Sequence, residues 1–147
     1  MRIAAGADHG GFAVKQAVVR HLRSQGHEVV DVGTDSGEVS VDYPVYGHRV
    51  AELVAAGEVE RGVLVCGTGL GICMAANRHQ GVRAADCTTP YLAEMARRHN
   101  DCNVLCLGGR LLSDDEAWAI VEVWLATPFE GGRHEHRVEL LDEGGAA

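Results

Sequence analysis

The chain has 147 residues, of which 46% are hydrophobic and 23% charged, and its formal net charge is −8 at pH 7. This length predicts a single domain over residues 1–147, and the acidic balance argues against a nucleic-acid partner. No apolar stretch of about 18 residues occurs, so we expect no membrane span. Asp8 and His9 come too early for a signal peptide. Five cysteines without a CxxC pair favour a reducing, cytoplasmic compartment.

Apolar strand patterns alternate with amphipathic helix patterns along the chain. Strands are predicted at residues 3–6, 28–32, 62–66, 82–85 and 103–107. Helices are predicted at 12–24, 44–56, 72–79, 91–99 and 114–126, with a short helical pattern near 138–141. Ser113 and Glu116 form a capping-box pattern before the helix at 114–126. The alternation predicts an α/β fold with three layers, Rossmann-like or flavodoxin-like, around a five-stranded parallel sheet.

Polar and glycine residues gather where several of these strands end. Residues 8–9 follow the first strand, residues 67–71 follow the third, and residues 108–110 follow the fifth. Ligands of open α/β sheets bind beyond the carboxyl ends of the strands, so we expect these three segments to share a site. His99 and Asn100 differ, because they lie at the end of a helix, just before the fifth strand.

The third strand carries the most informative segment, in which Cys66 is followed by Gly67, Thr68 and Gly69. The loop lacks the Lys of a Walker A sequence, the spacing of a dinucleotide fingerprint and the arginine of a cysteine phosphatase. Free backbone N–H groups in a glycine loop favour a small anion or an oxyanion. A thiol beside such donors is a candidate base. The alternative is a small buried hydrophobe, which is what we expect of Cys73, Cys87, Cys102 and Cys106.

A basic cluster near the C-terminus stands out against the acidic background. Arg133 and Arg137 are four residues apart, so on a helix they share a face and could hold one phosphate. The alternative is an ordinary solvated face. His134 and His136 diverge on a helix and have no evident third ligand, so we predict no metal site. Residues 8–11 and 99–101 likewise have plainer readings, as a capped turn and a helix C-cap.

Seven blocks of the sequence, in order and without large insertions, resemble the ribose-5-phosphate isomerase B family, which also contains the galactose-6-phosphate and allose-6-phosphate isomerases. The blocks are residues 6–12 (GADHGGF), 42–44 (DYP), 66–72 (CGTGLGI), 75–78 (AANR), 98–101 (RHND), 130–134 (EGGRH) and 137–138 (RV). The resemblance implies aldose–ketose isomerisation of a phosphorylated sugar through an enediolate, without a metal or an organic cofactor.

The resemblance also implies roles for individual residues. Cys66 would move the proton between C1 and C2, and His99 would be the acid that opens the furanose ring, with Asp8 binding sugar hydroxyls nearby. The oxyanion would be held by Thr68 and by the backbone N–H groups of Gly67, Gly69, Leu70 and Gly71. The phosphate would be bound by His9, Arg133 and Arg137, with Asn100 and Arg110 completing the pocket.

The family's site lies between two subunits, so the resemblance implies a homodimer or a dimer of dimers, with residues 127–147 at the interface. The leading substrate pair is ribose 5-phosphate and ribulose 5-phosphate. Allose 6-phosphate, galactose 6-phosphate, a tetrose phosphate or a rare free sugar remain alternatives, as does a noncatalytic sugar-phosphate-binding subunit. Two departures from the family pattern, Cys73 in place of a common Ser and the loop 33–41, leave the sugar preference open.

Overall fold

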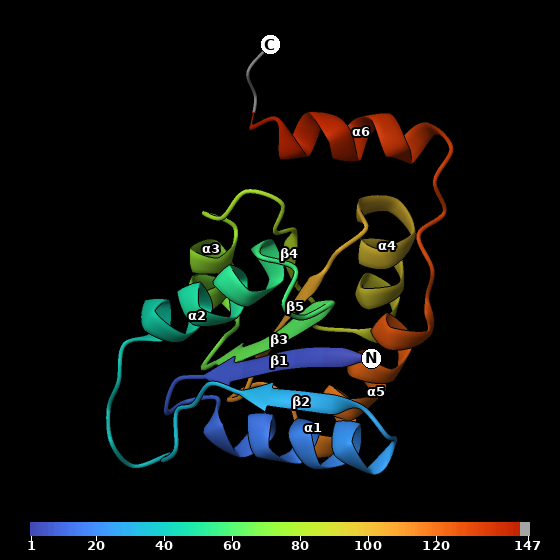
Figure 1. Cartoon of the computed structure of the whole chain (residues 1–147). Coiled ribbons are helices and arrows are strands. Elements are labelled where there is room, and N and C mark those ends of the chain that lie inside the picture. The colour runs from blue at the N-terminus through green and yellow to red at the C-terminus, as the bar shows by residue number, and fades with distance from the viewer. Residues whose placement is uncertain (145–147) are drawn as a thin grey trace.

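Five parallel strands form one sheet in the order β2-β1-β3-β5-β4 (Figure 1). The structure is a computed structural model and describes residues 1–144, so the end of the predicted 127–147 segment lies outside the described residues. The strands are β1 (Arg2–Ala7), β2 (Glu28–Asp31), β3 (Arg61–Cys66), β4 (Ala84–Asp86) and β5 (Val104–Gly108). The helices are α1 (Phe12–Ser24), α2 (Tyr43–Ala55), α3 (Leu70–Ala76), α4 (Pro90–Asn100), α5 (Asp114–Ala126) and α6 (Arg133–Asp142).

The sheet is covered on both faces, which confirms the predicted three-layer α/β fold. Successive side chains of a strand point to opposite faces, so Val63 and Val65 of β3 join the core formed with α1, α4 and α5. Leu64 and Cys66 join a second core, formed with α2 and α3. The three central strands β1, β3 and β5 are almost continuously buried, because neither face of a covered parallel sheet meets water.

Most predicted elements are confirmed to within two residues. The bounds of α1 and α5 agree fully, and the capping box is present: Ser113 Oγ accepts from the Glu116 N–H at 3.1 Å, and Glu116 Oε1 accepts from the Ser113 N–H at 3.0 Å. The strand predicted at 82–85 is displaced to Ala84–Asp86, because Val82 is held in a turn by its N–H bond to the His79 carbonyl.

Helix α3 begins at Leu70 and ends at Ala76, whereas the sequence predicted 72–79. Its N-cap, Gly69, adopts a left-handed conformation with φ +83°. That turn lets the helix begin immediately after the glycine loop, two residues earlier than the apolar pattern indicates.

Helix α6 lies apart from the sheet and packs beside α4 (Figure 1). Arg83, just before β4, holds the end of this helix through an ion pair with Asp142 at 3.0 Å and also pairs with Asp101 at 3.3 Å. Because Asp101 is the C-cap of α4, one guanidinium fixes the ends of both helices. Within residues 1–144, no helix is long and apolar enough to cross a membrane.

Candidate active site

Three loops meet at the carboxyl edge of the sheet, as the sequence predicted. The Asp8 N–H donates to the Val65 carbonyl at 3.2 Å, which joins the loop after β1 to the end of β3. The Gly109 N–H donates to the Cys66 carbonyl at 2.7 Å, which joins β3 to the loop after β5. These backbone bonds hold the three loops in a fixed relation before any ligand arrives.

Glycines permit the close approach of these loops. Gly11 packs against the Val65 backbone so tightly that a Cβ would overlap it, and a Cβ on Gly10 would lie 3.2 Å from the Gly67 nitrogen. The Arg110 guanidinium lies against the same loop, since a Cβ on Gly67 would be 3.0 Å from its Nη1. A cation therefore stands directly beside the glycine loop.

Cys66 is buried, with 5% of its surface exposed, and its sulfur faces the turn of the loop. The Gly69 N–H donates to Cys66 Sγ at 3.2 Å, and the Leu70 N–H donates to Thr68 Oγ1 at 3.3 Å. The loop thus combines a hydrogen-bonded thiol, an exposed hydroxyl and backbone donors, as a base with an adjacent oxyanion site requires.

Asp8 and His9 complete this side of the site. Asp8 is 8% exposed, and its Oδ1 accepts from the Gly11 N–H at 3.1 Å. His9 Nδ1 accepts from the Val41 N–H at 3.1 Å, so in the neutral ring the proton is on Nε2. This bond ties His9 to the 33–41 loop, which the sequence marked as atypical.

The remaining predicted residues lie together elsewhere, around the end of α4 and along α6. His99, Asn100 and Arg137 line a pocket of about 280 Å³ with His134, Val138 and Leu141. Arg133 and Arg137 are both on α6 and exposed, as the helical spacing predicted. The predicted residues therefore form two groups, one around the Cys66 loop and one at the end of α4 and along α6. The structure brings together the residues within each group but keeps the two groups apart.

The two groups lie at opposite edges of the sheet. Cys66 ends β3, whereas Arg61 begins it and donates to the Trp124 carbonyl at 2.9 Å. Burial lowers the pKa of Arg61, and the positive charge of Arg97 lowers it further, whereas the carboxylate of Asp101 raises it. Because Arg97 and Asp101 belong to the end of α4, Arg61 lies near that end of the helix. The six residues of β3 span about 16 Å, longer than an extended pentose phosphate. One chain cannot present both groups to one such ligand.

His134 lines the same pocket as His99 and Arg137, and the sequence interpretation missed it. Its ring is stacked on that of His99, with centroids 4.3 Å apart and planes 13° from parallel. A signal was available, since His134, Val138 and Leu141 recur at helical spacing and so share a face. His99, Glu130 and His134 have ligand atoms within 4.8 Å of one another, but stacked imidazoles direct their lone pairs side by side rather than at a shared ion.

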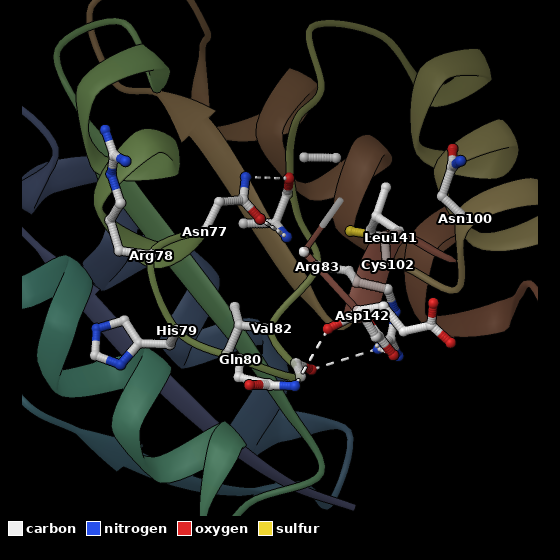
Figure 2. A pocket seen from close by; sticks show the side chains of 15 residues that line it. Asn77, Arg78, His79, Gln80, Val82, Arg83, Asn100, Cys102, Leu141 and Asp142 are labelled. Carbon is white, nitrogen blue, oxygen red and sulfur yellow. Dashed lines mark hydrogen bonds and ion pairs between the residues drawn. The ribbon is translucent and has the colours of Figure 1, made fainter. Parts of the chain in front are cut away.

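A larger pocket, of about 590 Å³, lies between the segment 77–85 and the end of α6 (Figure 2). Figure 2 shows Arg83 reaching Asp142 across it, while Asn77 bonds back to the chain at Ala84. Cys66 does not line this pocket. Several of its polar groups bond within the lining, since Arg83 pairs with Asp142 and the Gln80 amide donates to the Asp142 carbonyl at 3.2 Å.

A parallel α/β sheet with a thiol, a hydroxyl and N–H donors at its carboxyl edge defines an enzyme-like site for a small anionic ligand. The comparisons with known proteins narrow this class. The chain matches the Ribose/Galactose Isomerase family over residues 3–141. It is 50% identical to ribose-5-phosphate isomerase B of Escherichia coli over 140 residues, 95% of this chain and 93% of the relative. The chain therefore belongs to the ribose/galactose isomerase family.

Solved structures agree over almost the whole length. Ribose-5-phosphate isomerase B of Clostridium thermocellum superposes with a TM-score of 0.96 at 50% identity, covering 99% of this chain and 97% of that one. The enzyme of Mycoplasma genitalium with bound ribulose-5-phosphate has a TM-score of 0.94 at 38% identity, with coverage of 98% and 95%. The fold is thus that of ribose-5-phosphate isomerases of type B.

Proposed function

We propose that this chain interconverts ribose 5-phosphate and ribulose 5-phosphate, with Cys66 as the base. The observation that carries the proposal is the hydrogen bond from the Gly69 N–H to Cys66 Sγ, at the carboxyl edge where Asp8 and Arg110 also lie. Membership of the family and the 50% identity to a ribose-5-phosphate isomerase B support the substrate class. Five free thiols fit a reducing compartment, so we place the chain in the cytoplasm.

The reaction begins with ring opening. The C1–O4 bond of the furanose breaks with its electron pair going to O4, O4 takes a proton from His99, and the C1 hydroxyl loses its proton to solvent. The open aldehyde then loses its C2 proton to the Cys66 thiolate, and the electron pair forms the C1–C2 double bond. The negative charge develops on O1, where Thr68 and the loop N–H groups stabilise it.

The second half of the isomerisation delivers a proton to the other carbon, after the Cys66 thiol has exchanged its proton with solvent. O1 gains a proton as the C2 hydroxyl loses one, and the Cys66 thiol delivers its proton to C1, which leaves the ketone at C2. Arg133 and Arg137 hold the phosphate away from the reacting carbons. Removing a loop donor from such an oxyanion site costs about 3 kcal/mol of barrier.

The separation of the two groups supports a homodimer with shared sites. Cys66 of one protomer would face His99 of its partner, with Arg133 and Arg137 supplied alongside His99. Such a pairing brings a cationic face to the strand edge of an acidic chain, which a dianionic substrate requires. The exposed apolar residues Leu70, Met74 and Leu111 near that edge supply a surface that a second copy can cover.

A substrate panel tests the activity. Purified protein would be assayed with ribose 5-phosphate, allose 6-phosphate, a tetrose phosphate and free ribose, and C2 proton exchange would be followed in D₂O. We expect exchange with ribose 5-phosphate that Cys66→Ser abolishes and that the control Cys73→Ser retains. Full activity in Cys66→Ser would remove the proposed base, and preference for another sugar would change the substrate but not the chemistry.

Mixing two inactive variants tests the shared site. In a heterodimer of Cys66→Ala and His99→Asn, one site carries both substitutions and the other is intact. Because half of the dimers in an equal mixture are mixed and half of their sites are intact, co-refolding should restore about one quarter of wild-type activity. No recovery, with mixed dimers confirmed by native mass spectrometry, would place the whole site in one chain.

A further inference from the structure

His134 is buried although most of α6 is exposed. Its exposed fraction is 5%, and its side-chain Nε2 has no hydrogen-bond partner among residues 1–144. Oε1 of Glu130 lies 3.9 Å from this nitrogen, which is beyond hydrogen-bond range. An unpaired polar atom inside a protein disfavours the folded state, so another interaction has to hold this ring in place.

That interaction is the stack on His99, at 4.3 Å between centroids and 13° between planes. His99 belongs to the last turn of α4, so two separate helices bring the rings together. The stack covers one face of the His99 imidazole and limits its rotation about the side-chain bonds. Both rings line the 280 Å³ pocket that Arg137 also lines.

The groups around His134 keep its ring neutral. Burial lowers its pKa first, and the positive charges of His99, Arg133 and Arg137 lower it further, while Glu130 opposes them. These are the charged groups that face it from α4, from α6 and from the segment before α6. A neutral ring does not repel the imidazolium that His99 must become in order to donate a proton.

We infer that His134 is a positioning residue for His99, whose ring plane it fixes so that the proton is presented to the ring oxygen of the sugar. The inference rests on the proposed function, in which His99 is the acid of ring opening. His134 itself neither gains nor loses a proton in this step. Its contribution is orientation, which a loosely held acid lacks.

Two aldose substrates separate ring opening from isomerisation. Ribose 5-phosphate is a furanose, whereas a tetrose 4-phosphate is acyclic because the hydroxyl that would close its ring carries the phosphate. For His134→Leu we expect kcat/KM for ribose 5-phosphate to fall about tenfold, and kcat/KM for the tetrose phosphate to stay within twofold. His134→Phe retains a flat ring and should restore kcat/KM for ribose 5-phosphate to within threefold of wild type. His136→Ala, on the 75% exposed neighbour, is the control and should match wild type.

The outcomes separate this inference from the proposed function. Equal losses with both substrates for His134→Leu, or a loss in His134→Phe as large as in His134→Leu, would overturn the positioning role. If His99→Asn slows the reaction of ribose 5-phosphate while His134→Leu matches wild type, only this inference fails. If His99→Asn leaves the reaction of ribose 5-phosphate unchanged, the acid role of His99 in the proposed mechanism fails. Circular dichroism melts confirm that each variant is folded.

Discussion

The Gly69 N–H reaches Cys66 Sγ at 3.2 Å because Gly69 adopts φ +83°, a conformation that L side chains rarely occupy. The same residue packs against the Asp86 carboxyl, which a Cβ would overlap. The hydrogen bond to the Cys66 thiol thus depends on a residue without a side chain at position 69.

Gly69→Ala should therefore damage the site more than the fold. A left-handed non-glycine residue costs about 1 kcal/mol, and the overlap with Asp86 adds to that cost, while a displaced donor in such a loop lowers kcat by about 100-fold. Gly57→Ala is the matched control, because Gly57 has φ +71° with open space around it. We expect both variants to lose some thermal stability and only Gly69→Ala to lose kcat. Equal kcat in the two variants would contradict the role of this N–H.

Asp86→Asn should stabilise the protein at neutral pH. Asp86 Oδ1 is buried without a hydrogen-bond partner among residues 1–144, and burial raises the pKa of this carboxyl. The folded state then holds the proton more tightly than the unfolded state, so stability falls as pH rises through the unfolded value near 4. We expect the Tm of Asp86→Asn to exceed wild type by about 2–4 °C at pH 7.5.

That gain should shrink as the pH approaches 4, where the wild-type carboxyl is protonated as well. Asp35→Asn, on an exposed loop residue, is the control and should show no pH-dependent gain. Melts followed by circular dichroism from pH 4 to pH 8 provide the measurement. A gain that is equal at all pH values would show that ionisation of Asp86 is not its cause.

Lys15 links the stability of the fold to the site. Its side chain is 1% exposed, and its Nζ pairs with Asp31 at 2.8 Å and donates to the Thr34 carbonyl at 2.9 Å. Lys15→Met leaves the Asp31 carboxylate without its cation, and we expect about 3 kcal/mol of lost stability in urea titrations. Arg20→Met, on an exposed residue of the same helix, should change stability by less than about 0.5 kcal/mol.

The double variant Lys15→Met/Asp31→Asn should recover part of the loss, because no unpaired carboxylate remains. If the double variant is no more stable than Lys15→Met, the ion pair is not the origin of the loss. KM should also rise in Lys15→Met, since the loop that follows Thr34 supplies the Val41 N–H bonded to His9.

The thiols should differ in their reactivity with iodoacetamide. Burial raises the pKa of Cys87 to about 12 and that of Cys102 to about 11, and it also raises that of Cys106. A hydrogen bond with Cys106 lowers the pKa of the half-buried Cys73. At pH 8 we expect peptide mass spectrometry to find Cys73 labelled and these three buried cysteines unlabelled, until urea exposes them. Early labelling of Cys106 in the folded protein would contradict this order.

Sequence patterns predicted the strands and helices well where the physical signal is local. The capping box at Ser113 and the period of α1 are such signals, because propensity and apolar spacing act within a few residues. The start of α3 was placed too late, since the backbone conformation of Gly69 rather than an apolar pattern sets it. Asp86 gave no signal at all, because a carboxylate at a strand end is ordinary until the packing around it is known.

The sequence by itself determined the alternation of strands and helices, the thiol-and-glycine loop at the end of β3 and the helical spacing of Arg133 and Arg137. These depend on local spacing, which one chain carries in its residue order. Only the tertiary structure decided that Cys66 and His99 lie at opposite edges of the sheet, and that the ring of His134 stacks on that of His99. Such relations arise when distant segments pack together, and residue spacing along a chain does not encode them directly.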